Sequence, residues 1–318
     1  MSRATRSLET RIRAYDSAGL AEAAALIMAG EPVAVPTETV YGLAADATND
    51  LAVARIYEAK GRPSFNPLIV HVSDVAMAHQ LVSFNATAQA LAEAFWPGAL
   101  TMVLPRLPDS PVAGLASAGL PTLAVRLPSH PAMRALIGAA AVPLAAPSAN
   151  RSGAISPTRA SHVLASLGGR IPFILDAGPA SDGVESTIVE PLDDAIILLR
   201  PGPVTPERLE AITGRPVRAP AASAGITAPG QLESHYAPSK PLMLNCTDPA
   251  PGSFHIGFGP GPSQRNLSPS GDVVEAAANL FAALHEADES AAARISVAPI
   301  PSEGLGLAIN DRLRRAAA

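Results

Sequence analysis

Two cations stand one glycine apart in the segment KGRPSFNPL (60–68), which follows a predicted helix and precedes a predicted buried strand. Pro63 and Pro67 fix the connecting turn, because each locks φ and removes a backbone donor. A guanidinium group can donate two parallel hydrogen bonds to phosphate oxygens, and an ammonium group supplies a compact positive charge. Lys60 and Arg62 therefore indicate polyanion binding, with a solvated basic turn as the alternative.

Polar loops follow several predicted strands at their carboxyl ends, where α/β proteins bind ligands. The segment PTETVYGL (36–43) offers two threonine hydroxyls and a carboxylate, and PSANRSG (147–153) offers small hydroxyl and amide groups. Arg200 stands at the end of a later strand, where a cation can face a phosphate. Serine- and asparagine-rich loops are more often simple turns, so an ordinary turn remains the alternative for each motif alone.

Two predicted strands carry polar side chains on a defined face. His71 lies between Val70 and Val72, so its side chain points away from theirs. A core histidine bonded to a backbone carbonyl is one interpretation, and a ligand contact is the other. Thr122 and Arg126 are four residues apart in another strand and share a face. That face either borders a polar pocket or pairs with an acid at a sheet edge.

The composition excludes several classes of protein. The net charge of −5 and the 16% of charged residues argue against nucleic-acid binding driven by charge alone. The single cysteine, Cys246, rules out an internal disulfide and a cysteine-based zinc site. The sequence contains no P-loop, no G-x-G-x-x-G motif, no Ser-His-Asp elbow and no histidine-rich metal spacing. We therefore expect no dedicated metal site.

Targeting signals are not expected either. The arginine-rich N-terminus is not followed by an apolar segment, so a secretory signal is not predicted. The most apolar run, 135–147, is too short to span a bilayer and is broken by Pro143. We expect a cytoplasmic protein without membrane contact.

Short apolar runs alternate with helical periodicity along the first part of the chain, which predicts an α/β fold with a mixed sheet. Strands are predicted at 32–35, 68–72, 100–104, 122–127, 142–146, 173–176, 186–190 and 195–199. Helices are predicted over 20–28 and after caps at Asp50, Asn85 and Thr205. Farther on, strands are predicted at 242–244, 254–258 and 295–298, and helices at 273–284 and 305–315.

This pattern predicts three parts. Residues 1–213 form a catalytic α/β domain, residues 214–240 form a linker rich in Pro, Ala, Gly and Ser, and residues 241–318 form a small α/β domain. Within the linker, SHYAP (234–238) combines aromatic and titratable side chains. We expect it to fold over the pocket as a lid that excludes water.

Seven segments, in this order, resemble the threonylcarbamoyl-AMP synthase family in its long, two-domain form. They are PTETVYGL (36–43), KGRPSFNPL (60–68), TLAVRLP (122–128), PSAN (147–150), GVESTIV (183–189), LRPG (199–202) and SHYAP (234–238). The resemblance runs from about Leu20 to the C-terminus. It implies a YrdC-like twisted mixed sheet with helices, then a linker and a small Rossmann-like α/β domain. It further implies a nucleotidyltransferase that converts L-threonine, bicarbonate and ATP into threonylcarbamoyl-AMP and pyrophosphate.

The resemblance also implies partners and residue roles. A separate, transiently bound transferase moves the threonylcarbamoyl group onto the adenosine beside the anticodon of certain tRNAs. Mg²⁺ is expected with ATP, without dedicated protein ligands. By motif position, Lys60 and Arg62 are the catalytic cations that hold the phosphates. The expected threonine contacts are Thr39, His71, Arg126, Ala146 and Ser186, and the expected ATP contacts are Arg62, Asn66, Thr122, Ser148, Ser156, Arg200 and Tyr236.

Two other interpretations of the YrdC-like segments were weighed. In the hydrogenase-maturation carbamoyltransferases, the YrdC-like module accompanies cysteine-based zinc fingers, which one cysteine cannot supply. A YrdC-like module that binds double-stranded RNA through a basic face, without turnover, is the other alternative. The net acidity argues against it, although tRNA or double-stranded RNA contact through a local basic patch stays open.

Overall fold

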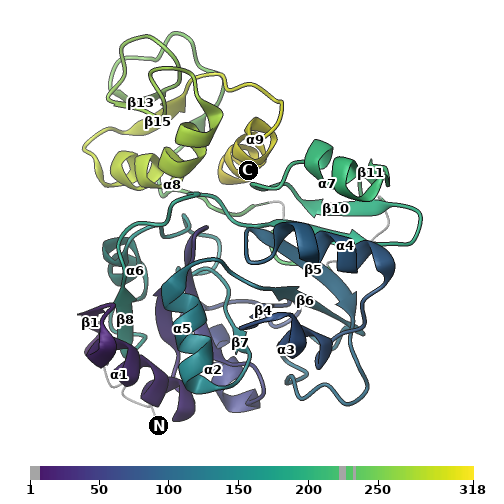
Figure 1. Ribbon diagram of the computed structural model, residues 1–318. Coiled ribbons are helices and arrows are strands. Elements are labelled where there is room, and N and C mark those ends of the chain that lie inside the picture. Colours follow the sequence, from purple (N-terminus) through teal and green to yellow (C-terminus); the bar gives the residue numbers. More distant parts are fainter. Residues whose placement is uncertain (1–7, 222–226, 232–233) are drawn as a thin grey trace.

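The computed structural model describes residues 8–221, 227–231 and 234–318. Residues 1–7 of the predicted catalytic domain, and 222–226 and 232–233 of the predicted linker, lie outside the described residues. Within the described part the chain forms an 11-stranded sheet and a 4-stranded sheet. Figure 1 shows the large sheet with its helices below and the small sheet with α8 and α9 above. The two-part α/β architecture expected from the sequence is confirmed.

The large sheet is mixed, as predicted, because parallel and antiparallel neighbours occur side by side. For example, β2 and β3 form an antiparallel hairpin, whereas β4 and β6 are parallel. From edge to edge its strands are β1 (Arg11–Ala14), β8 (Phe173–Asp176), β2 (Val33–Pro36), β3 (Tyr41–Asp46), β7 (Leu144–Ala145), β4 (Ile69–His71), β6 (Thr122–Arg126), β5 (Leu100–Pro105), β9 (Thr187–Pro191), β10 (Ile196–Arg200) and β11 (Val217–Arg218).

Helices cover both faces of this sheet. Successive residues of β2 show why, since Val33 and Val35 pack with α1 and α5, whereas Ala34 packs in the core that contains α2, α4 and α6. In the described ranges no helix is both long enough and apolar enough to cross a membrane. The helices are α1 (Ser17–Met28), α2 (Asp50–Lys60), α3 (Val75–His79), α4 (Ala86–Phe95), α5 (Pro131–Ala140), α6 (Ala160–Leu167) and α7 (Pro206–Thr213).

The small sheet is parallel throughout its described pairs, and this agrees with the expected Rossmann-like domain. Its strands, in spatial order, are β12 (Leu242–Met243), β15 (Arg294–Val297), β13 (Ser253–Gly257) and β14 (Arg265–Asn266). They are packed by α8 (Val273–Glu289) and α9 (Gly306–Ala316).

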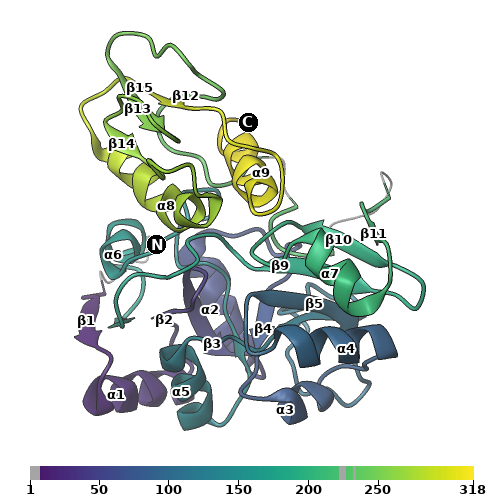
Figure 2. The same cartoon turned by 45° about the horizontal axis from the view of Figure 1, so that its top comes forward.

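The core of the small domain extends into the large one. Leu280 and Phe281 of α8 belong to the same buried cluster as Val184 and Tyr236. Figure 2 shows α8 lying along the top of the large domain, next to α6. At Gly183, whose φ is +71°, an added Cβ would stand 2.4 Å from the carbonyl oxygen of Ala277. Only glycine allows α8 to approach the large domain this closely.

The structure corrects several local predictions. Helix α2 is capped by the side chain of Asn49, not by Asp50. The strand predicted at 142–146 is shorter in the structure and comprises Leu144–Ala145. It begins after Pro143, which has no backbone N–H to donate to a neighbouring strand. The predicted linker contains β11, which pairs in parallel with β10. The sequence also did not predict β1, β3, β14, α3, α5 and α6.

We expect Gly183→Ala to lower the melting temperature more than Gly214→Ala does. Both glycines have positive φ, but an added Cβ at Gly214 meets nothing within 4 Å. The shared backbone strain costs about 1 kcal/mol, and the clash with α8 adds about 1–3 kcal/mol at Gly183 alone. Scanning calorimetry of both variants measures the difference. Equal losses would mean that α8 does not press on this glycine.

Candidate functional site

Most of the predicted site residues surround one cavity, where polar side chains from distant parts of the chain converge as they do in ligand sites. It is lined by the β2–β3 turn, by the ends of β4, β6 and β10, and by the linker residues Pro229, Gly230, His235 and Tyr236. The predicted site residues found in its lining are Thr39, Arg62, His71, Arg126, Ala146, Ser148, Ser186, Arg200 and Tyr236.

Arg62 is held by its own motif. Gly61 ends α2 in the left-handed conformation, with φ 61°, and turns the chain toward the cavity. The Arg62 Nε donates to the carbonyl of Asn66 at 3.2 Å, and Nη2 donates to that of Pro67 at 2.9 Å. Burial lowers the pKa of Arg62 to about 10, so the guanidinium is still charged at neutral pH. The KGRPSFNPL turn thus fixes one cation at the cavity wall.

Lys60 lies behind this wall and is absent from the cavity lining. Its ammonium donates to the carbonyl of Ser148 at 2.6 Å and to that of Asn150 at 2.5 Å. Burial, with the charge of Arg62 nearby, holds the pKa of Lys60 well below its usual value. The contacts tie the PSAN loop to the end of α2, and the loop places Ser148 in the cavity.

Arg126 makes polar contacts along its whole guanidinium group. Its Nη2 lies 2.6 Å from Oε1 of Glu38, Nη1 donates to Oγ1 of Thr39 at 2.9 Å, and Nε donates to the carbonyl of Gly98 at 3.1 Å. Of the two alternatives left open by the sequence, Arg126 borders a polar cavity. It also pairs with an acid, but not at a sheet edge, because β6 lies between β4 and β5 inside the sheet.

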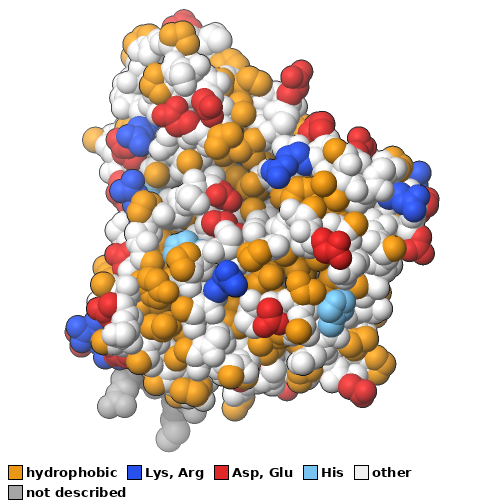
Figure 3. All heavy atoms as spheres, viewed as in Figure 1, with side chains coloured by type: hydrophobic (Ala, Val, Ile, Leu, Met, Phe, Trp, Pro, Cys, Tyr) orange, Lys and Arg blue, Asp and Glu red, His pale blue; other side chains and the backbone are white. Residues whose placement is uncertain are grey.

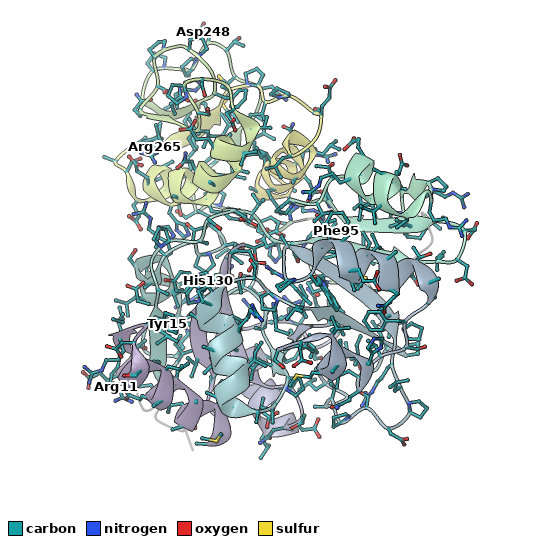
Figure 4. All side chains as sticks on the ribbon, in the orientation of Figure 1. Arg11, Tyr15, Phe95, His130, Asp248 and Arg265 are labelled. Atoms are coloured by element: carbon teal, nitrogen blue, oxygen red, sulfur yellow. The ribbon has the colours of Figure 1, made fainter. Side chains whose placement is uncertain are left out.

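Glu38 was missed as a site residue, although it lies within PTETVYGL. Its carboxylate also accepts the backbone N–H groups of Ser129 at 3.2 Å and His130 at 3.4 Å, where α5 begins. Figure 4 labels His130 at the end of α5 that faces the middle of the molecule. Burial alone would raise the pKa of Glu38, but the attraction of Arg126 and these hydrogen bonds outweigh it and lower the pKa to about 2.

His71 presents a neutral ring to the cavity. Burial and the charge of Arg126 lower its pKa to about 3, so it is uncharged at neutral pH. Among the described residues its buried Nδ1 has no hydrogen-bond partner. A buried polar atom without a partner is costly, and a bound ligand can supply the missing hydrogen bond.

Arg200 is fixed by the GVEST motif. Its Nε donates to the carbonyl of Ser186 at 3.0 Å, and Nη2 donates to Oγ of Ser186 at 3.1 Å. The linker covers this arginine, since an added Cβ at Gly230 would lie 2.9 Å from its Cδ. Tyr236 is buried beside it, and the ring of His235 packs edge-on against Tyr236 with centroids 4.0 Å apart. His235 also lines the cavity, although it was not among the predicted site residues.

Three residues that the sequence predicted to contact ATP lie outside the cavity lining. Ser156 is fully buried, and its hydroxyl donates to Oε1 of Glu185 at 2.5 Å. Asn66 is buried, and its carbonyl accepts from Arg62 and Tyr57. Thr122 begins β6, about 13 Å along the strand from Arg126. Their contacts with a nucleotide stay predictions.

Glu185 and Arg312 also belong to the site but were not predicted. Glu185 lines the cavity, and its signal in the sequence was its place in GVEST. Arg312, on α9, donates to its Oε2 at 2.7 Å. No motif marks Arg312, so its contact required the three-dimensional structure.

The described residues do not provide a metal site. None of their side chains gather into a group of three or more metal-ligating His, Cys, Asp or Glu residues. The two carboxylates beside the cavity, Glu38 and Glu185, are each ion-paired with an arginine. These donors do not fit a dedicated Mg²⁺ site in the protein.

Two family models together span most of the chain. Residues 25–202 match a Sua5/YciO/YrdC model described as telomere recombination. Residues 204–318 match the model of the threonylcarbamoyl-AMP synthase C-terminal domain.

Known proteins resemble the chain over nearly its whole length. The threonylcarbamoyl-AMP synthase of Bacillus subtilis is 42% identical over 94% of this chain and 92% of its own length. That of Pyrococcus abyssi is 38% identical over 92% of each chain. The crystal structure of P. abyssi Sua5 complexed with L-threonine superposes with a TM-score of 0.86 at 36% identity, covering 98% of this chain and 97% of that one.

We expect Glu38→Gln to remove part of the acid sensitivity of the fold. The pKa of Glu38 falls from 4.5 to about 2 on folding, so its carboxylate stabilises the protein above pH 4.5 and loses this effect as the pH falls toward 2. At pH 7 the effect is worth about 3 kcal/mol.

The check is the melting temperature of the protein and the variant between pH 7 and pH 3. The gap between the two should be widest at neutral pH and should shrink below pH 4.5. Glu93→Gln, which removes an exposed acid from α4, is the control. A gap that stays constant with pH would show that Glu38 is not a depressed carboxylate.

Proposed function

This chain belongs to the threonylcarbamoyl-AMP synthase family, and on that premise we propose that it forms threonylcarbamoyl-AMP and pyrophosphate from L-threonine, bicarbonate and ATP. The observation that carries the proposal is the cavity, where Arg62, Arg126 and Arg200 from distant parts of the sequence meet. Buried arginines suit a triphosphate and a carboxylate.

The reaction needs no nucleophile from the protein. The threonine amine and bicarbonate give a carbamate with loss of water, and a carbamate oxygen attacks the α-phosphorus while pyrophosphate leaves. Catalysis then consists of positioning the reactants and of stabilising the negative charge that develops on the phosphates. This agrees with a cavity whose polar side chains are mainly arginines and hydroxyls, with His71, His235 and the arginine-paired Glu185 beside them.

We assign Arg62, Arg200 and Ser148 to the phosphates. The geometry supports a positioning role for Lys60, which reaches the site through the carbonyls of the PSAN loop. Its contact with phosphate, expected from the motif, would require the ammonium to leave Ser148 and Asn150.

We assign the region around the β2–β3 turn to threonine. Arg126 holds the Thr39 hydroxyl in place and supplies positive charge for the substrate carboxylate. His71 is neutral, so its free Nδ1 can form a hydrogen bond with the amine or carbamate. Ser186 and the backbone of Ala146 complete this part of the cavity wall.

We propose that the SHYAP segment acts as a lid. Tyr236 is buried and lines the cavity together with Pro229 and Gly230. A nucleotide that reaches Arg200 must therefore pass beneath this segment or displace it. A closed lid would exclude water from the carbamate and the adenylate.

Mg²⁺ and the partners remain part of the proposal. Since the donors beside the cavity do not fit a metal site, Mg²⁺ would be bound by the phosphates of ATP, and no step is assigned to it. The product is a mixed anhydride that a tRNA-modifying transferase would consume, and we propose that both proteins work in the cytoplasm, where ATP and tRNA are present.

A double-stranded RNA-binding module is not favoured. On the face shown in Figure 3, lysine and arginine side chains are scattered singly among acidic ones. Binding to a phosphate backbone usually needs a continuous basic surface.

Purified protein should release pyrophosphate from ATP only when L-threonine and bicarbonate are both present. A coupled pyrophosphate assay and mass spectrometry of the adenylate measure this. Omission of threonine or bicarbonate, one at a time, is the control. A folded protein that releases no pyrophosphate with all three substrates would refute the proposed reaction.

We expect Arg62→Met to lower kcat/KM for ATP by about 10²-fold, since one lost charge stabiliser is worth about 3 kcal/mol. Lys60→Met should also lower kcat/KM, but because it releases the PSAN loop that places Ser148 in the cavity. Arg55→Met is the matched control, because Arg55 also lies on α2 but pairs with Glu31 at the surface. Steady-state pyrophosphate release with varied ATP gives the values. Near-normal turnover in both variants would show that neither Lys60 nor Arg62 contributes to the reaction.

A further inference from the structure

A charged side chain of the second domain lies directly behind the cavity wall and contacts Glu185, which lines the cavity. Arg312, on α9, is 0% exposed and is the largest fully buried side chain in the described part of the chain. Its Nε donates to Oε2 of Glu185 at 2.7 Å, and Nη2 donates to the Glu185 carbonyl at 3.3 Å. A buried ion pair is a poor source of stability because both charges lose their water.

Glu185 is the partner that ties Arg312 to the site. One carboxylate oxygen accepts from Arg312, and the other accepts from the hydroxyl of Ser156. A serine hydroxyl has a single proton, and here that proton is donated to Glu185. Any further hydrogen bond of the Ser156 oxygen is therefore one that it accepts. Ser156 is fully buried and outside the cavity lining, so a nucleotide would have to open the cavity wall to reach it. The oxygen would then suit a ribose hydroxyl or an amino group, not a phosphate oxygen.

The charge of Glu185 would oppose nucleotide binding if it were not balanced. The residue lines the same cavity as Arg62 and Arg200, which we assign to the phosphates. Burial alone would raise its pKa, but Arg312 and Arg200 hold the pKa below its usual value, so Glu185 is ionised. An ionised carboxylate beside a triphosphate repels it unless a cation neutralises the carboxylate.

Arg312 is shared between two acids, but its charge is available to Glu185 because the second acid has another arginine. The other acid near it, Asp311, accepts from Nη1 of Arg312 at 2.8 Å but also has Arg315, whose Nε lies 3.2 Å from both of its carboxylate oxygens. The Arg312 guanidinium carbon also lies 5.5 Å from the ring centroid of Tyr236, the aromatic residue of the lid. One side chain of α9 thus contacts the cavity wall and lies over the lid.

We infer that Arg312 is a positioning residue for ATP: it neutralises Glu185 and, through Glu185, orients Ser156 as a hydrogen-bond acceptor. On this inference the small domain contributes Arg312 to the nucleotide site, in addition to holding the linker in place. This inference rests on the proposed function, because it assumes that the cavity takes ATP.

The test is the affinity for ATP, measured by titration calorimetry without threonine, so that it does not depend on turnover. Arg312→Met should weaken ATP binding by at least about tenfold, because it leaves Glu185 buried and unpaired. The KM for L-threonine should change by less than about threefold. Arg314→Met, on the same helix but with a side chain 73% exposed, is the matched control and should bind ATP normally.

Removing the charge of Glu185 as well distinguishes charge neutralisation by Arg312 from a contribution to the stability of the fold alone. In the double variant Arg312→Met/Glu185→Gln no unpaired charge is left, so ATP affinity should return to within about threefold of the unmodified protein. Arg312→Lys, which keeps the charge, should lie between the two. If Arg312→Met alone does not fold, the double variant carries the test, since its neutral pair removes the buried charge.

Two results would overturn the inference. One is an unchanged ATP affinity in folded Arg312→Met, and the other is a folded double variant that binds ATP as weakly as the single one. Failure of the proposed function is a different result, because then the unmodified protein itself would bind no ATP and release no pyrophosphate.

Discussion

The structure depends on burying several cations around one cavity. Removing a guanidinium or an ammonium from water is expensive unless polar partners replace the lost hydration. Here backbone carbonyls are the common partners, as in the contacts of Lys60 with the PSAN loop and of Arg62 with Asn66 and Pro67. A carbonyl offsets desolvation without cancelling the charge. The site therefore keeps a positive potential for an anionic substrate.

The fold supplies these carbonyls because the sheet brings strand ends and their loops together. The turn after β2, the ends of β4, β6 and β10, and the PSAN loop all border the cavity. Two buried acids partly neutralise the positive charge around the cavity, and each of them forms an ion pair with a different arginine. Glu38 pairs with Arg126 within the large domain, whereas Glu185 pairs with Arg312 across the two domains. A buried glutamate–arginine ion pair thus helps to set the net charge at each of these two places beside the cavity.

The sequence predicts the parts of this arrangement better than their pairing. Apolar runs located most strands, and polar motifs at strand ends located most of the cavity wall. The strand β3 was missed because Tyr41–Asp46 contains Gly42 and two alanines, which have low strand propensity. The pairing of Arg312 with Glu185 spans 127 residues, and no local pattern encodes a contact of that range. Likewise, Lys60 stands in a motif that was predicted to bind phosphate, yet its partners depend on where a distant loop packs.

The most direct test is a crystal structure of this protein with L-threonine and an unreactive ATP analogue. Our account predicts phosphate oxygens within hydrogen-bond distance of the Arg62 and Arg200 guanidinium groups, with the threonine carboxylate nearest Arg126. It also predicts that the nucleotide approaches Ser156 with a hydroxyl or an amino group. A triphosphate bound outside this cavity, with all three arginines still bonded only to protein, would contradict it.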